Sequence, residues 1–150
     1  MLFRSSVFIG LLMTGLVISL PLQVFGATCS GATYKGPDFE QEVTEFSPFD
    51  TIYLILDCSG LRPGEHVMHA NWIHQKRGTI RSDKYEFRAE DGRKRGIFFW
   101  FKLNKKGPMA SMLSNQDFHE ENFGDWAVEA YLDDQLLMTE SFKITEDVSD

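Results

Sequence analysis

Short runs in which apolar and polar residues alternate make up most of the chain beyond its first third. A period of two residues is typical of β-strands, and the β-branched and aromatic side chains in these runs also favour strands. Gly, Pro, Asn and Asp separate the runs about every ten residues, as expected for tight turns. The predicted strands lie in residues 49–58, 65–75, 84–88 and 96–103, and a hairpin fills residues 123–144.

The residues before these runs have a weaker pattern. Residues 27–48 contain several Gly and Pro residues and are expected to be irregular, with a weak first strand at about residues 39–46. The chain offers six to eight short strands and no long amphipathic helix. An antiparallel β-sandwich satisfies this pattern, and a closed β-barrel is the alternative.

The run at residues 96–103 is apolar on both faces. Ile97, Phe99 and Phe101 alternate with Phe98 and Trp100 along the predicted strand. One set is expected in the core, and the other would form an aromatic contact surface if it remained exposed. Lysines and arginines flank the run, which is typical of charges that protect an apolar strand from aggregation.

The first 26 residues have the pattern of an export signal. Arg4 is the only charge in the first 34 residues, and an apolar run of about 14 residues follows it at 7–20. A small residue, Gly26, then offers a cleavage site for a secretory signal. A membrane anchor is the alternative, but Pro21 leaves the run shorter than the roughly 20 apolar residues that span a bilayer. We expect a periplasmic or secreted domain at 27–150, with membrane contact only through an uncleaved signal.

The chain has two cysteines, Cys29 and Cys58, which are 29 residues apart. In an oxidising compartment a lone pair usually forms a disulfide. Redox or metal chemistry is the alternative, but the wide spacing and the lack of a CxxC motif disfavour it. We therefore predict a structural disulfide between them.

Two stretches resemble a known kind of domain. Pro63-Gly64-Glu65-His66 leads into a strand with a central Trp, and residues 123–131, Phe-Gly-Asp-Trp-Ala-Val-Glu-Ala-Tyr, lead into the closing strand. Over residues 49–144 the chain thus resembles bacterial immunoglobulin-like and fibronectin III-like sandwich domains, in which a PGxH turn and a GxWxVxxY strand recur. The resemblance implies about seven strands, an extracytoplasmic setting and no active site. The inter-sheet cysteine pair of antibody domains is not matched, because Cys29 precedes the expected sandwich.

Three histidines, His66, His69 and His74, lie close together in the sequence. On a strand, His66 and His74 share a face but stand about 26 Å apart at full extension, and His69 points to the opposite face. Bonds of about 2 Å to one zinc ion are then out of reach. We expect these histidines to be exposed or to lie in turns.

A second candidate metal set consists of Met109, Met112 and His119. Thioether and imidazole ligands in a periplasmic sandwich suit copper(I), so a carrier of copper or another metal is the alternative function. Methionine more often fills gaps in a core, and no cofactor is expected. The acidic residues nearby lack the regular spacing of a calcium-binding loop.

Charge is distributed unevenly along the chain. Residues 76–106 contain 11 Lys or Arg and four acidic residues, a net charge of +7, whereas the whole chain carries −7. Placed on one side of a sandwich, these cations would bind phosphate, anionic lipid, acidic polysaccharide or an acidic protein. The alternative is a solvated edge that protects the apolar strand. The candidate contact residues are Arg77, Arg81, Lys84, Arg88, Arg93, Lys94, Arg95 and Lys102.

The sequence shows no GxSxG or HExxH motif and no phosphate-binding glycine loop. We therefore expect a non-catalytic extracytoplasmic binding or assembly module rather than an enzyme. Its basic middle, residues 76–106, would contact a protein or an anionic envelope component. Nucleic acid is disfavoured as a partner by the expected compartment and by the overall acidity.

Overall fold

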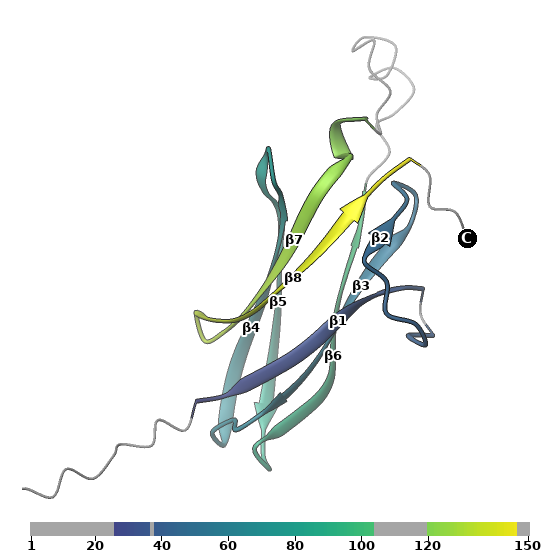
Figure 1. Ribbon diagram of the computed structural model, residues 1–150. Coiled ribbons are helices and arrows are strands. Elements are labelled where there is room, and N and C mark those ends of the chain that lie inside the picture. The colour runs from purple at the N-terminus through teal and green to yellow at the C-terminus, as the bar shows by residue number, and fades with distance from the viewer. Residues whose placement is uncertain (1–25, 37, 104–119, 147–150) are drawn as a thin grey trace, which may run out of the picture.

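Two β-sheets pack face to face in the computed structural model, which describes residues 26–36, 38–103 and 120–146 (Figure 1). A short 3-10 turn, η1 (Glu120–Asn122), precedes the last hairpin. The strands are β1 (Thr28–Lys35), β2 (Glu45–Phe46), β3 (Thr51–Ser59), β4 (Gly64–His74), β5 (Gly78–Ala89), β6 (Arg93–Lys102), β7 (Gly124–Leu132) and β8 (Gln135–Ile144).

The strand order is that of an immunoglobulin-like sandwich. One sheet has the order β1-β3-β6, and the other has the order β2-β8-β7-β4-β5. Strands β1, β3 and β6 correspond to A, B and E of an immunoglobulin domain, and β8, β7, β4 and β5 correspond to G, F, C and C′. The predicted all-β immunoglobulin-like sandwich is therefore confirmed, and the barrel alternative is wrong.

Aromatic rings fill the space between the sheets. Trp72 on β4 is fully buried and stacks on Phe101 of β6, with ring centroids 5.1 Å apart. Trp126 and Phe142, from β7 and β8, complete the cluster. On β6 the side chains of Ile97, Phe99 and Phe101 point into the core, whereas those of Phe98 and Trp100 point outward. Burying side chains of this size contributes roughly 1.5–3 kcal/mol each.

The first strand corrects the expectation of an irregular segment at residues 27–48. Strand β1 occupies residues 28–35, and the expected strand at 39–46 shrinks to the two residues of β2. Thr33 is the only fully buried residue of β1, so the apolar alternation that marks a strand is missing. Gly31 does not break the strand. It lets β1 approach β3, because a Cβ atom there would collide with the Ile55 carbonyl oxygen and the Leu56 side chain.

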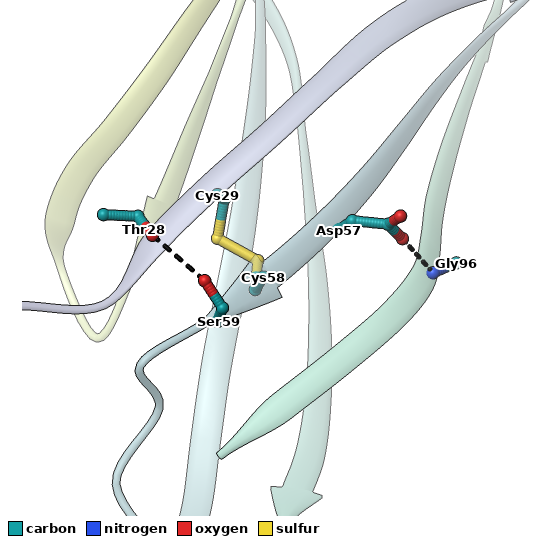
Figure 2. Close-up of a disulfide and its surroundings, with 6 residues drawn as sticks. All are labelled: Thr28, Cys29, Asp57, Cys58, Ser59 and Gly96. Atoms are coloured by element: carbon teal, nitrogen blue, oxygen red, sulfur yellow. Dashed lines mark hydrogen bonds between the residues drawn. A yellow bond between two sulfur atoms is a disulfide. The ribbon is translucent and has the colours of Figure 1, made fainter.

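The predicted disulfide joins β1 to β3 within one sheet (Figure 2). Cys29 and Cys58 are direct cross-strand partners. Beside them, the hydroxyls of Thr28 and Ser59 lie 3.2 Å apart. Cys29 thus belongs to the sandwich and does not precede it as expected. The pair still differs from the inter-sheet bridge of antibody domains, because both strands lie in one sheet.

Within the described part of the chain, no helix has the length and apolar character that crossing a membrane requires.

Candidate functional site: an aromatic face beside a basic edge

Strands β5 and β6 end their respective sheets on the same side of the sandwich. Two cations bridge them. The guanidinium of Arg81 on β5 lies over the ring of Trp100 on β6, with Cζ 4.9 Å from the ring centroid. In the other direction, Lys94 Nζ of β6 lies 5.9 Å from the Phe87 ring of β5. Cations over aromatic faces are attracted by the ring quadrupole, so these contacts link the two open edges.

Arg81 is fixed in place by a carboxylate that is itself tied to the core. The Nε and Nη2 atoms of Arg81 lie 2.8 and 2.7 Å from Asp83 Oδ1. The other oxygen of Asp83 accepts a 3.0 Å hydrogen bond from the indole N–H of Trp72. A continuous series of contacts therefore runs from the buried Trp72 to the exposed Trp100.

Aromatic rings, some exposed and some half-buried, lie across the outer face of the three-stranded sheet. Tyr34, Tyr53 and Trp100 are cross-strand neighbours and form one row over β1, β3 and β6. Ile55 and Phe98 are partners in the next row. Phe98 and Trp100 are 56% and 46% exposed and, together with their cross-strand neighbours, form a continuous apolar patch.

A strained residue adds one more ring to this surface. Phe39 has a φ of 52°, a left-handed conformation that bulky residues rarely adopt. Its ring packs edge-on against Tyr34 and Tyr53, with centroids 6.0 and 5.3 Å away. Burial, followed by the nearby Glu42 carboxylate, raises the pKa of Tyr34. We define the aromatic face as Tyr34, Phe39, Tyr53, Ile55, Phe98 and Trp100.

The predicted basic residues follow the β5–β6 side of the sandwich but do not share one face. Lys84 and Arg88 point to the outer face of the five-stranded sheet, where they pair with Glu86 and Glu65 at 2.6 and 3.2 Å. Lys102 lies on the opposite outer face, beside Trp100. The expectation of one cationic patch is thereby corrected, since alternation along β5 and β6 directs the side chains to opposite sides.

Five of the eight predicted cations form no ion pair within the part of the chain that the structure describes: Arg77, Arg93, Lys94, Arg95 and Lys102. Of these, Arg93, Arg95 and Lys102 of β6 are exposed. Arg77 instead donates hydrogen bonds from Nη1 to the Glu121 carbonyl and to Asn122 Oδ1, both at 3.1 Å. The available positive charge therefore concentrates on β6, with Lys102 beside Trp100 and with Arg93 and Arg95 toward the disulfide end of the strand.

His66 is buried, which corrects its expected exposure. Its Nδ1 lies 2.7 Å from Asp133 Oδ2 and its Nε2 lies 2.7 Å from the Arg62 carbonyl oxygen. The bond to the Arg62 carbonyl raises the pKa of His66, burial opposes this rise, and the bond to Asp133 adds to it. Because both acceptors favour an N–H, the ring is best accommodated as imidazolium. Neither ring nitrogen is left to take a proton from a substrate.

His74 is also buried, and its two nitrogens have different roles. Nε2 lies 3.2 Å from the Phe123 carbonyl oxygen, and Nδ1 accepts from the Lys76 amide at 3.2 Å. His69 is half-buried on the outer face of the same sheet. The core-facing and outward-facing histidines are thus separated by the sheet, and they cannot converge on one metal ion.

The candidate copper ligands Met109, Met112 and His119 lie outside the described residues. Within residues 26–36, 38–103 and 120–146, no three His, Cys, Asp or Glu side chains are placed to hold a metal ion.

Sequence reasoning identified Phe98, Trp100 and the cations but missed the series from Trp72 through Asp83 to Arg81. The spacing of Arg81 and Asp83, two residues apart on a strand, was a usable signal because such residues share a face. The contact with Trp100 had no local signal, since it depends on how two sheets dock.

No protein-family model and no curated protein matches the chain. Among solved structures, the chain is similar to an immunoglobulin-like protein from Pseudomonas aeruginosa, with 14% identity and a TM-score of 0.44 over 80% of this chain and 97% of that protein. It is also similar to part of an alkylpurine DNA glycosylase from Pseudomonas fluorescens bound to DNA containing an abasic site analogue. That match has 9% identity and a TM-score of 0.42, and covers 79% of this chain and 30% of the glycosylase. The assignment of an immunoglobulin-like sandwich rests on the strand order.

Proposed function

We propose that the protein is a non-catalytic extracytoplasmic binding module that contacts an acidic protein partner through its aromatic face. The main support for this proposal is the row of Tyr34, Tyr53 and Trp100, in which the guanidinium of Arg81 lies over the Trp100 ring. Trp, Tyr and Arg are the residue types that contribute most to protein–protein affinity, and they do so where they cluster.

The surroundings of the aromatic face favour an acidic protein over other anionic partners. Arg93, Arg95 and Lys102 offer positive charge without a described acidic partner, so they would attract carboxylates and speed association. The exposed rings of Phe98 and Trp100 would be buried by apolar side chains of a protein partner. An acidic protein with exposed apolar side chains supplies both kinds of contact, carboxylates for the cations and apolar groups for the rings.

The disulfide supports an extracytoplasmic setting. Cysteine pairs such as Cys29–Cys58 persist in oxidising compartments and are rare in the cytosol. The export signal expected at residues 1–26 points the same way.

His66 and Asp133 form the one acid–imidazole pair among the described residues, and its geometry favours a structural role over a catalytic one. The second nitrogen of His66 is engaged by the Arg62 carbonyl. A general base needs a free nitrogen within reach of its substrate. The pair instead connects β4 to the turn between β7 and β8.

The proposal can be tested by placing a photo-crosslinking amino acid at position 98 in the living source organism. Position 136 is the matched control, because Leu136 is 48% exposed but belongs to the other sheet. We expect a protein adduct from position 98 and none from position 136, and binding of the purified partner that weakens as salt rises. Adducts only to lipid or polysaccharide, or equal protein adducts from both positions, would refute the proposal.

A further inference from the structure

A small hollow opens at one end of the β5–β6 edge, next to η1. Its volume is about 260 Å³. We propose that it binds a carboxylate carried next to an apolar group, as in an acidic residue of a partner protein, an inference that rests on the proposed function. The residues that line it are Arg77, Ile80, Arg81, Phe101, Lys102, Leu103, Glu121 and Asn122.

Both guanidinium groups are held before any ligand arrives. Arg77 Nη1 donates to the Glu121 carbonyl and to Asn122 Oδ1, and Asn122 is only 3% exposed. Arg81 is held by Asp83 from one side and packs on Trp100. Side chains that are already ordered lose little conformational entropy on binding, so their hydrogen bonds contribute more of their strength to affinity.

The charge of the lining favours an anion. Three cations, Arg77, Arg81 and Lys102, face one acidic residue, Glu121. Asp83 neutralises Arg81, but Lys102 forms no ion pair with any described residue. Arginine and lysine form short, charge-assisted hydrogen bonds with carboxylates.

The apolar residues that line the hollow favour a carboxylate attached to an apolar group. Ile80 and Leu103, both half-buried, supply apolar surface to the same hollow as the cations, and the buried Phe101 lies at its inner wall. A ligand with methylene groups next to its carboxylate can bury them against this apolar surface, which stabilises the complex. A peptide with glutamate between leucines has this character, whereas a uronic acid chain has hydroxyl groups where the apolar surface is needed.

The probe is a blocked Leu-Glu-Leu-Glu-Leu peptide, compared with its Leu-Gln-Leu-Gln-Leu counterpart, and binding is followed by amide chemical shifts. We expect at least tenfold weaker binding of the glutamine peptide, with the largest shifts near Arg77, Arg81 and Lys102. Lys102→Gln should weaken binding about fivefold. Lys84→Gln is the matched control, since Lys84 lies on the other outer face and should leave affinity unchanged.

Equal affinity for both peptides, or equal loss from Lys102→Gln and Lys84→Gln, would overturn the carboxylate site. Shifts confined to Phe98 and Trp100 would overturn it while leaving the proposed function intact. Failure of the cross-link at position 98 would instead refute the proposed function. Tighter binding of oligogalacturonate or of anionic phospholipid vesicles than of the glutamate peptide would overturn the assignment to a protein ligand.

Discussion

Arg81 and Trp100 join the edges of two sheets between which no described strands are paired by hydrogen bonds. The guanidinium spans from β5 to the outer face of β6, and its position depends on Asp83 and therefore on the core residue Trp72. The exposed surface that we propose for binding is thus anchored in the interior.

Asp83 is expected to stabilise the fold as well as to hold Arg81. Asp83→Ala leaves the indole N–H of the buried Trp72 without its partner and should lower the free energy of unfolding by about 2 kcal/mol. Asp83→Asn retains an acceptor oxygen and should cost less. Urea unfolding measures both, with Glu86→Ala on β5 as the control that should change stability far less, because its ion pair with Lys84 lies on the surface. Equal stability of Asp83→Ala and the native protein would show that the bond contributes nothing.

The disulfide should contribute substantially to stability because it closes a loop between residues 29 positions apart. Replacing Cys29 and Cys58 together by Ala should lower the free energy of unfolding by about 3 kcal/mol. Chemical denaturation of the oxidised native protein and the double variant provides the comparison. Thiol labelling of the protein isolated from its source organism should find both cysteines blocked until reductant is added, and free thiols would argue against an oxidising compartment.

Gly31 is expected to tolerate no larger side chain. Gly31→Ala forces the new Cβ atom into the Ile55 backbone and the Leu56 side chain. Overpacking of this kind costs about 1–3 kcal/mol, which thermal unfolding would register as a lower melting temperature. Ser30→Ala on the same strand is the control, because Ser30 is exposed. If both variants melted alike, β1 would not lie as close to β3 as described.

The His66–Asp133 pair should make stability depend on pH. The pKa of His66 is raised above its usual value, so its contribution is complete below about pH 6.5 and is lost as pH rises through the folded-state pKa. The pKa of Asp133 is lowered: burial opposes the shift, but bonds from the Val67 amide and His66 outweigh it. That contribution is lost only as pH falls below the usual carboxyl range.

His66→Gln tests this dependence. The variant should lose about 2 kcal/mol of unfolding free energy at pH 5.5, where the native imidazolium keeps both bonds, and less at pH 8.5. Phe87 stacks on the His66 ring, and Arg62 is the nearby cation that opposes its protonation. Urea titrations at the two pH values suffice. An identical loss at both pH values would mean that folding does not shift the pKa of His66, and a smaller loss at pH 5.5 would mean that the ring stays neutral in the folded protein.

The sequence predicts the strands that carry large apolar side chains and misses the one that does not. Residues 49–58 and 96–103 are recognisable as strands because they are rich in β-branched and aromatic side chains, and β3 and β6 overlap most of both runs. Strand β1 has small and hydroxyl side chains, and its strand character comes from pairing with β3 along its whole length. That pairing is non-local, so no window of the sequence contains it.

For the candidate site, too, some features follow from the sequence and others require the structure. Exposure of Phe98 and Trp100 follows from alternation once the inward face of β6 is known. The aromatic face as a unit needs the register that aligns Tyr34 with Tyr53 and Tyr53 with Trp100. The split of the cations between opposite faces likewise depends on which side of β5 faces the core.

The most direct measurement is the affinity of the partner captured at position 98 for the purified native protein, Phe98→Ser and Leu136→Ser, by calorimetry. Both replaced side chains are exposed to a similar degree, 56% and 48%, on different sheets, so effects on solubility should match. We predict that Phe98→Ser raises the dissociation constant at least tenfold, as expected for a residue at the centre of an interface, and that Leu136→Ser changes it less than twofold. Equal effects, or a larger effect of Leu136→Ser, would contradict binding through the outer face of the three-stranded sheet.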